Sequence, residues 1–376
     1  MKVLIVGGYG NFGRRLVKSL VEFYDYEVII AGRSLDKANI FRNEIASNYG
    51  KNIDVIQLDI FSPNLAGALR NISPDVVVNA SGPFQYQLGD NNYSVARACI
   101  ESNSHYVDFA DDRDFVTNFQ KELSELAQSR KLMLVSGAST VPGLTAAVLD
   151  HFSATYSQIH SIQYGISPGN RTERGEGTIA SILSYTGKPF TTVCNGKQQT
   201  IHGWQGLDRH DFGFPLGKRW MGNCNIPDLD LLLERYPSLK TVIFQAGLEV
   251  SILHLGLWFL SFFSRFGIVK NWSRYSSVIT RMSEWFVSLG TDSGGMFVNL
   301  KGLDNSGQEK NIYWQLVAEN GEGPNVPTIP AELLIKRLSK GDVQSGAMPC
   351  MGLFTLGEFF DIASRWGIYQ KEIGND

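Results

Sequence analysis

Cysteine and surplus charge of either sign are scarce in this 376-residue sequence. Its four cysteines are Cys99, Cys194, Cys224 and Cys350. They form no Cys-x-x-Cys pair and have no histidine at metal-ligand spacing, so we expect no disulfide framework and no metal site. The 34 basic and 37 acidic residues give a formal charge of −3. A nearly neutral chain lacks the basic footprint that nucleic acid requires, so we expect no nucleic-acid partner.

The sequence also lacks an apolar run long enough to predict a membrane-spanning helix. The apolar run 252–263 (ILHLGLWFLSFF) is shorter than the roughly 20 residues of a span, and Arg265 and Lys270 follow it. A buried or oligomer-interface helix is favoured for this run. Contact with a membrane surface, or the lining of an apolar pocket, is the alternative. Because Val3–Val6 is too short for a signal-peptide core, we expect a cytoplasmic protein.

Enough apolar material is present for real hydrophobic cores, with 43% hydrophobic residues. The length predicts two domains. Up to about residue 140, short continuous apolar runs alternate with amphipathic segments, which is typical of a doubly wound α/β domain with a parallel sheet. The predicted strands are Val3–Val6, Val28–Ala31, Val55–Leu58, Val76–Asn79, Tyr106–Val107 and Leu132–Ser136. The predicted helices are Phe12–Phe23, Tyr93–Ile100 and Phe115–Ala127, the last capped by Asp114.

Beyond residue 140 the pattern changes to hairpins. Phe190–Val193 and Thr200–His202 flank Asn195-Gly196, and Phe297–Leu303 and Ile312–Ala318 flank a second turn. This favours a second α+β domain with a largely antiparallel sheet. We therefore predict a Rossmann domain over 1–140 and a substrate and dimerisation domain over 141–344. We expect the C-terminal segment of about 345–376 to return to the first domain.

The glycine cluster at 8–13 carries the strongest functional signal. Gly8, Gly10 and Gly13 match G-x-G-x-x-G, directly after the first predicted strand and at the start of the first predicted helix. In that context the glycines permit a tight turn, close approach of the backbone to a pyrophosphate, and close packing of helix on strand. The pyrophosphate would lie at the positive end of the helix. The motif therefore predicts a dinucleotide site.

The end of the second strand distinguishes NADP from NAD. Arg33 and Ser34 stand where an NAD site carries a carboxylate, and the first acidic residue after the second strand is Asp36. A guanidinium and a hydroxyl suit a 2′-phosphate, so NADP is favoured over NAD. Asp59, after the third strand, either contacts the adenine side or caps the next turn. Ser81, Gly82, Pro83 and Phe84, after the fourth strand, either adjoin the nicotinamide or form an ordinary Gly-Pro turn.

Several segments together resemble saccharopine dehydrogenase-like proteins. They are VLIVGGYGNFGRRL (3–16), AGRS (31–34), VVNASGPF (77–84), HYVDF (105–109), SGASTVPGL (136–144), GGMFVNL (294–300), WQLVA (314–318) and PNVPTIPAEL (324–333). The resemblance implies an NAD(P)-binding Rossmann domain and a second α+β domain for substrate binding and dimerisation. By position it implies cofactor contacts from Gly8, Gly10, Asn11, Phe12, Gly13, Arg33 and Ser34. The basic residues that hold a multiply carboxylated substrate in such proteins have no match here, which favours a more apolar substrate.

Candidate catalytic groups follow the strands nearest the expected nicotinamide. Asp108 and Asp111 follow the fifth strand, where helix capping or a solvated acidic loop is the alternative role. Ser139 follows the sixth strand and either binds a carbonyl or caps the next helix. In the second domain His202, His210 and Arg219 either line the cleft or are structural.

The function predicted from these features is an NADP-dependent oxidoreductase, forming a homodimer, with a small or moderately apolar molecule as substrate. A catalytically silent NADP(H) sensor or assembly protein is the alternative, because a Rossmann site establishes binding and not reaction.

Overall fold

The computed structural model describes residues 1–89, 92–173 and 175–373. The chain forms two compact units. The first contains Met1–Leu144 and Pro324–Phe354, and the second contains Thr145–Gly323 and Thr355–Asp376. In the structure the chain first leaves the first unit after Leu144. The segment 345–376 is divided between the two units.

The first unit is built on a parallel sheet of seven strands in the order β15-β6-β5-β4-β1-β2-β3. Its strands are β1 (Lys2–Val6), β2 (Glu27–Gly32), β3 (Asp54–Gln57), β4 (Val76–Asn79), β5 (His105–Asp108), β6 (Met133–Ser136) and β15 (Gly346–Pro349). Its helices are α1 (Asn11–Phe23), α2 (Leu35–Tyr49), α3 (Leu65–Ile72), α4 (Ser94–Ser102), α5 (Arg113–Ser129) and α11 (Ile329–Ser339). The predicted doubly wound parallel sheet is confirmed, and the chain order reverses between β1 and β4.

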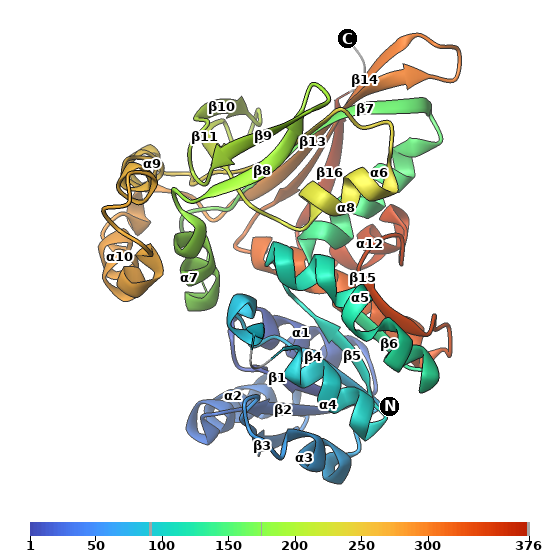
Figure 1. Cartoon of the computed structure of the whole chain (residues 1–376). Helices are drawn as coiled ribbons and strands as arrows, with labels where there is room; N and C mark the ends of the chain where they lie inside the picture. The colour runs from blue at the N-terminus through green and yellow to red at the C-terminus, as the bar shows by residue number, and fades with distance from the viewer. Residues whose placement is uncertain (90–91, 174, 374–376) are drawn as a thin grey trace. The chain divides into compact units, whose positions relative to one another are not determined.

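Helices cover both faces of this sheet because its central strands are apolar on both sides (Figure 1). On one face α1 packs against α2 and α11, and on the other α4 packs against α3 and α5. A buried carboxylate joins α1 to α11: Glu332 accepts hydrogen bonds from the hydroxyls of Ser19 (2.6 Å) and Tyr24 (2.8 Å). The late segment 324–354 is therefore an integral part of the unit.

One predicted cap in this unit is wrong. Asp114 lies in the first turn of α5, and Asp112 is the N-cap, its side chain accepting a hydrogen bond from the Phe115 N–H at 3.0 Å. The helix begins two residues earlier than its apolar periodicity indicates, because Arg113 and Asp114 are polar residues of the first turn.

The second unit contains a mixed, mostly antiparallel sheet in the order β10-β11-β12-β7-β13-β14-β16, in which only β12 and β7 pair in parallel. Its strands are β7 (Tyr156–Ser167), β10 (Asp208–Asp211), β11 (Lys218–Asn223), β12 (Thr241–Ala246), β13 (Gly294–Asp304), β14 (Glu309–Ala318) and β16 (Ile368–Ile373). The hairpin of β8 (Pro189–Cys194) and β9 (Lys197–His202) forms a separate two-stranded sheet. Both predicted hairpins and the largely antiparallel sheet are confirmed.

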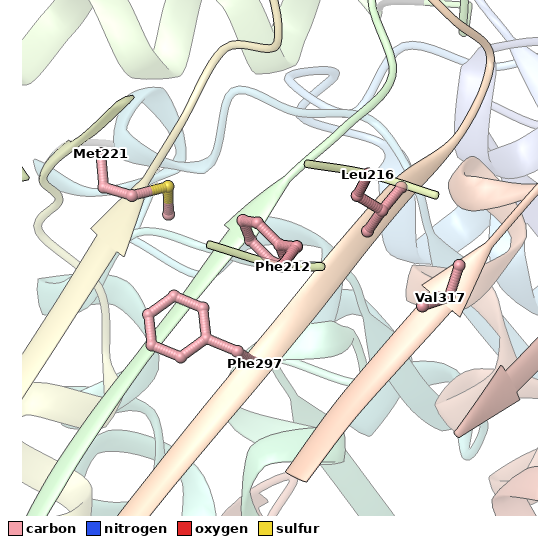
Figure 2. Packing of buried hydrophobic residues seen from close by; sticks show 5 residues of the cluster. All are labelled: Phe212, Leu216, Met221, Phe297 and Val317. Atoms are coloured by element: carbon pink, nitrogen blue, oxygen red, sulfur yellow. The ribbon is translucent and has the colours of Figure 1, made fainter. Parts of the chain in front are cut away.

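The two faces of this sheet are covered differently. Helices α6 (Thr145–Ser153), α8 (Asp228–Arg235) and α12 (Leu356–Ala363) pack on one face. The other face carries an apolar cluster in which Phe212 and Leu216, from the segment between β10 and β11, cover Met221, Phe297 and Val317 (Figure 2). His210 stacks on Phe297, with ring centroids 3.6 Å apart. An aromatic layer, in which His210, Phe297 and Tyr313 are stacked, therefore lies on this second face.

The remaining helices of the second unit are α7 (Glu176–Tyr185), α9 (Ser251–Arg265) and α10 (Ser276–Glu284). Helix α9 contains the apolar run 252–263, and only its residues His254, Leu257 and Ser261 are buried. The run therefore does not form a fully buried helix. Among the residues that the structure describes, no helix has the length and apolar character needed to cross a bilayer.

Candidate functional site

A tight glycine turn connects β1 to α1 in the first unit. Gly7 has a φ of +76°, and a Cβ placed there would lie 3.0 Å from the backbone of Ala80 at the end of β4. A Cβ at Gly13 would overlap the carbonyl oxygen of Gly7, so α1 can pack this closely only with glycine at that position. The predicted motif therefore has the structural role expected of it. Gly7, which we did not single out from the sequence, belongs to the same turn.

The N-terminus of α1 is suited to an anion. Gly10 is its N-cap, no side chain caps this end, and no acidic residue lies in the first turn. The first backbone N–H groups of a helix have no intrahelical acceptor and mark its positive end. A Cβ at Gly10 would meet only the Gly7 carbonyl oxygen, at 3.1 Å, so the outer side of the glycine is open. These features fit a pyrophosphate at Gly10, Asn11, Phe12 and Gly13.

The end of β2 lies against this turn through Tyr9. The Tyr9 hydroxyl accepts a hydrogen bond from the Ser34 N–H at 3.1 Å, and the Tyr9 ring occupies the space that a Cβ at Gly32 would need. The Ser34 hydroxyl caps α2 by accepting a hydrogen bond from the Lys37 N–H, and Arg33 is exposed. A guanidinium, a hydroxyl and a second helix N-terminus therefore converge at this end of the strand. That set fits a 2′-phosphate.

Tyr9 was missed from the sequence, because the motif leaves its position unspecified. The only signal was an aromatic residue between two of the glycines.

Asp59 follows β3 and is exposed. Its carboxylate accepts a hydrogen bond from the Phe61 N–H at 3.1 Å, so it caps the turn that follows the strand. Capping of this turn was one of the two roles predicted for Asp59. The other, a contact to the adenine side of the cofactor, stays a prediction.

A buried polar network fixes the segment after β4. Asn79 accepts hydrogen bonds from the Ser81 backbone N–H (3.1 Å) and hydroxyl (2.5 Å), and its amide nitrogen donates to Gln87 (2.9 Å) and Tyr106 (3.3 Å). Gln87 in turn donates to the Ser81 carbonyl oxygen at 2.9 Å. The loop 80–83 is therefore held rigidly while Gly82 remains exposed. Phe84 is buried and packs against Phe115.

Asp108, at the end of β5, is fully buried. One of its carboxylate oxygens accepts hydrogen bonds from the N–H groups of Ala110 (2.9 Å) and Gly137 (2.8 Å) and from the Ser136 hydroxyl (3.0 Å). Burial raises the pKa of Asp108 to about 6, although these hydrogen bonds act in the opposite direction. Asp108 therefore joins the ends of β5 and β6.

The two other predicted catalytic residues are half-exposed. Asp111 lies between β5 and the N-cap of α5, and Ser139 follows β6. The sheet brings the ends of β4, β5 and β6 side by side, so Ser81, Asp111 and Ser139 follow three adjacent strands at one edge. All three are half-exposed, as contact with a substrate requires, whereas Asp108 is buried.

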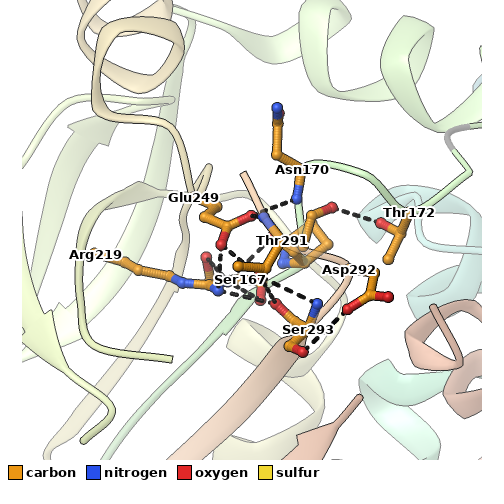
Figure 3. A network of polar contacts seen from close by, with 10 residues as sticks. Ser167, Asn170, Thr172, Arg219, Glu249, Thr291, Asp292 and Ser293 are labelled. Atoms are coloured by element: carbon orange, nitrogen blue, oxygen red, sulfur yellow. Dashed lines mark hydrogen bonds and ion pairs between the residues drawn. The ribbon is translucent and has the colours of Figure 1, made fainter. Parts of the chain in front are cut away.

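The second unit contains a separate polar network around Arg219 (Figure 3). Arg219 is 2% exposed and donates to the carbonyl oxygens of Ser167 (2.9 Å), Pro168 (3.2 Å) and Ser293 (2.9 Å). It also pairs with Glu249 at 3.3 Å.

Glu249 accepts further hydrogen bonds from the backbone N–H groups of Asn170 (2.6 Å) and Thr291 (2.9 Å) and from the Thr291 hydroxyl (2.6 Å). Arg219 and Glu249 thus fix the segments that follow β7 and precede β13.

The two histidines predicted with Arg219 both have a lowered pKa. His210 is bonded to the Tyr313 hydroxyl at 2.9 Å, and burial lowers its pKa to about 4. Burial, and to a smaller extent Arg265, lowers the pKa of His202. His210 is therefore neutral near pH 7, and Arg219 is committed to a structural network.

The first unit thus has the fold and the glycine turn of a dinucleotide-binding protein. Residues 3–135 match the family described as saccharopine dehydrogenase NADP binding domain. These residues belong to that domain family, and the resemblance predicted from the sequence is confirmed. NADP is the dinucleotide of this family, which confirms the cofactor prediction.

Three solved structures are similar to this chain to different extents. Apo saccharopine dehydrogenase (L-Glu forming) from Saccharomyces cerevisiae is similar at a TM-score of 0.67 and 14% identity, over 100% of both chains. A meso-DAPDH mutant with DAP from Clostridium tetani E88 is similar over 95% of both chains, at a TM-score of 0.46 and 13% identity. A UDP-glucose-4-epimerase from Stenotrophomonas maltophila matches 32% of this chain and 39% of its own, at a TM-score of 0.26 and 20% identity. Only the first supports a likeness over the whole fold.

Proposed function

We propose that this chain is an NADP-dependent oxidoreductase acting on a small or moderately apolar substrate. The observation that carries the proposal is the junction of the glycine turn with the end of β2, where Tyr9 joins the anion-binding end of α1 to Arg33 and Ser34. When bound, NADP(H) supplies the hydride chemistry. The chain's own residues bind the dinucleotide, orient it and provide groups for proton movement.

The residues at the ends of β4, β5 and β6 divide into two kinds. Asn79, Ser81 and Asp108 are positioning residues, because their hydrogen bonds are made within the protein. Asp111 and Ser139 are the proposed substrate contacts, since both are half-exposed at the end of adjacent strands. A hydroxyl at Ser139 can donate a hydrogen bond to a substrate carbonyl or imine. A carboxylate at Asp111 can accept or return a proton.

The charges in the second unit support the proposed substrate class. Arg219 is neutralised by Glu249 and three carbonyl oxygens, and Lys371 donates to the Phe214 carbonyl oxygen at 2.7 Å. His210 is neutral near pH 7 and lies in an aromatic layer with Phe297 and Tyr313. Such an environment suits an apolar or aromatic group better than several carboxylates.

The test is oxidation of NADPH, followed at 25 °C with a panel of imino acids, enones and ketones. Turnover that is lost in Ser139→Ala or Asp111→Asn, with NADPH affinity retained, supports these roles. Ser129→Ala, at an exposed serine that ends α5, is a matched control and should retain full activity. NADPH binding without turnover of any compound would instead favour the alternative, a sensor or assembly protein. Failure to bind NADPH would contradict both.

The quaternary state and compartment remain predictions. We expect a homodimer in the cytoplasm, and sedimentation equilibrium of the purified protein tests the first of these.

A further inference from the structure

Residues 251–289 form a helical arm on the second unit. The arm contains α9, the short 3-10 segment η4 (Trp272–Tyr275), α10 and the short 3-10 segment η5 (Val287–Leu289). Helix α9 contacts β11, and α10 and η4 contact α7, so the arm lies at one edge of the second sheet (Figure 1).

One face of the arm is packed. His254, Leu257 and Ser261 of α9 are buried, and Trp272 and Ile279 pack against the apolar cluster of Leu183, Trp204 and Leu257. The arm is also anchored by hydrogen bonds. Trp272 donates its indole N–H to the Leu260 carbonyl oxygen at 3.1 Å, and Asn170 donates its amide to the Phe286 carbonyl oxygen at 2.7 Å. The arm is therefore folded against the second unit.

The opposite face is apolar and exposed. Ten of the seventeen exposed large apolar side chains found among the described residues belong to the arm. On α9, Ile252 (59% exposed) and Phe259 (58%) are seven residues apart and thus lie on the same helix face. Phe266 (72%), the C-cap, continues this spacing. The remaining seven are Ile268, Tyr275, Val278, Met282, Trp285, Val287 and Leu289. We call these ten side chains the apolar stripe.

The stripe on α10 has helical spacing too. Val278, Met282 and Trp285 follow one another at intervals of four and three residues, which places them on one face. Concentration of this many exposed apolar side chains in one segment marks an interaction surface, because single scattered ones are the norm elsewhere on proteins.

Basic residues accompany the stripe. The arm contains four basic residues, Arg265, Lys270, Arg274 and Arg281, and one acidic residue, Glu284, which gives it a charge of +3 in a chain of formal charge −3. All four basic residues are exposed. Arg274 and Arg281 stand four residues before and three residues after Val278, so they border the stripe on α10.

We propose that the helical arm docks on the surface of a bilayer containing anionic phospholipids. Amphipathic helices with aromatic and aliphatic side chains on one face and basic residues beside it lie in the membrane interface. The basic residues would contact lipid phosphates while the apolar stripe enters the headgroup and acyl boundary. A second copy of the chain is a poorer occupant. A two-fold contact through the arm would bring together two surfaces that each carry a charge of +3, and these would repel.

The experiment is flotation of the full chain with two kinds of vesicle, phosphatidylcholine alone and phosphatidylcholine mixed with phosphatidylserine. Three proteins are compared: wild type, the triple variant Phe259→Ser, Phe266→Ser and Trp285→Ser, and the charge variant Arg274→Glu with Arg281→Glu. All five positions are exposed, so the variants should fold. Unchanged melting temperature and NADPH affinity check this. The matched control is Ile40→Ser with Leu126→Ser, two exposed apolar residues of the first unit.

Wild type and the control should float with the phosphatidylserine vesicles, less so at high salt. The triple variant should remain at the bottom of the gradient, and the charge variant should lose its preference for phosphatidylserine. Absence of wild-type flotation, or equal flotation of the triple variant, would overturn the proposal. So would a wild-type dimer that becomes monomeric in the triple variant without any vesicle binding, because the arm would then be a contact between copies.

Discussion

The hydroxyl of Tyr9 accepts a hydrogen bond from the backbone N–H of Ser34 at 3.1 Å. This bond joins two segments that are 25 residues apart in the chain, the glycine turn after β1 and the end of β2. The Tyr9 ring also lies where a side chain at residue 32 would have to go. The pyrophosphate end and the 2′-phosphate end of the proposed site are therefore held in one arrangement before cofactor arrives.

Replacing Tyr9 by Phe keeps the ring and removes this bond. A neutral hydrogen bond contributes about 0.5–1.5 kcal/mol, so we expect NADPH affinity to fall about twofold to tenfold in a fluorescence titration. Tyr26→Phe is the control, because the Tyr26 hydroxyl bonds to Ser339 (3.0 Å), away from the glycine turn. Equal affinity in wild type and Tyr9→Phe would show that the bond does not prepare the site.

Replacing Arg33 by Asp should reverse the preference between the two dinucleotides. Hydrogen bonds to charged groups contribute about 1.5–3 kcal/mol, so NADPH affinity should fall about tenfold to hundredfold while NADH affinity is retained or rises. Arg130→Asp changes an exposed arginine that precedes β6, at the other edge of the sheet, and should leave both affinities unchanged. If Arg33→Asp bound NADPH as wild type does, Arg33 would be a solvated surface residue.

Two glycines of the turn should respond differently to alanine. In Gly13→Ala the new Cβ overlaps the Gly7 carbonyl oxygen, so we expect a lower melting temperature and loss of NADPH binding. In Gly10→Ala the new Cβ lies 3.1 Å from the same oxygen and points to the open side of the turn. We expect weaker NADPH binding with a small change in melting temperature. Calorimetry and titration on both variants separate the two effects, and an unstable Gly10→Ala would contradict the assignment.

Two buried carboxyl groups make stability depend on pH. Burial raises the pKa of Asp228 to about 7, against hydrogen bonds from Thr145 and Tyr164, and burial raises the pKa of Asp108 to about 6. The ordinary pKa of an aspartate is about 3.8. In this range the folded state binds more protons than the unfolded state, so the free energy of unfolding falls as pH rises from about 4 to 7.

Asp228→Asn cannot ionise and should lose the Asp228 part of this fall. Urea denaturation at a series of pH values measures it, with exposed Asp361→Asn as the control. A slope identical to that of wild type would mean that Asp228 ionises normally.

Much of the first unit could be predicted from the sequence, because a strand buried on both faces leaves a continuous apolar run. Val76–Asn79 and Val3–Val6 are such runs, and they pair as β4 and β1. The strand β15 could not be predicted in this way. Its residues Gly346–Pro349 (GAMP) have no β-branched side chain, and its place beside β6 depends on contacts across more than 200 residues of chain.

The functional residues also divide into those that a local sequence pattern reveals and those that it does not. Gly8, Gly10 and Gly13 have fixed spacing, so a local pattern reveals them. Tyr9 acts through a hydrogen bond to Ser34, and Arg219 through carbonyl oxygens of segments that β7 and β13 bring together. Neither contact can be recognised from a local sequence pattern, because the tertiary fold determines which residues meet. The stripe of the helical arm is intermediate: its apolar residues are evident in the sequence, but their exposure is not.

The late return of the chain to β15 and α11 affects how the protein folds during synthesis. A ribosome that has completed residue 144 has made six of the seven strands of the first sheet, but not the Glu332 carboxylate that Ser19 and Tyr24 require. At about 5–20 residues per second, residues 145–354 take on the order of ten to forty seconds to emerge. Throughout that interval the nascent first unit has an unpaired edge at β6, a site at which a chaperone or a premature partner strand can bind.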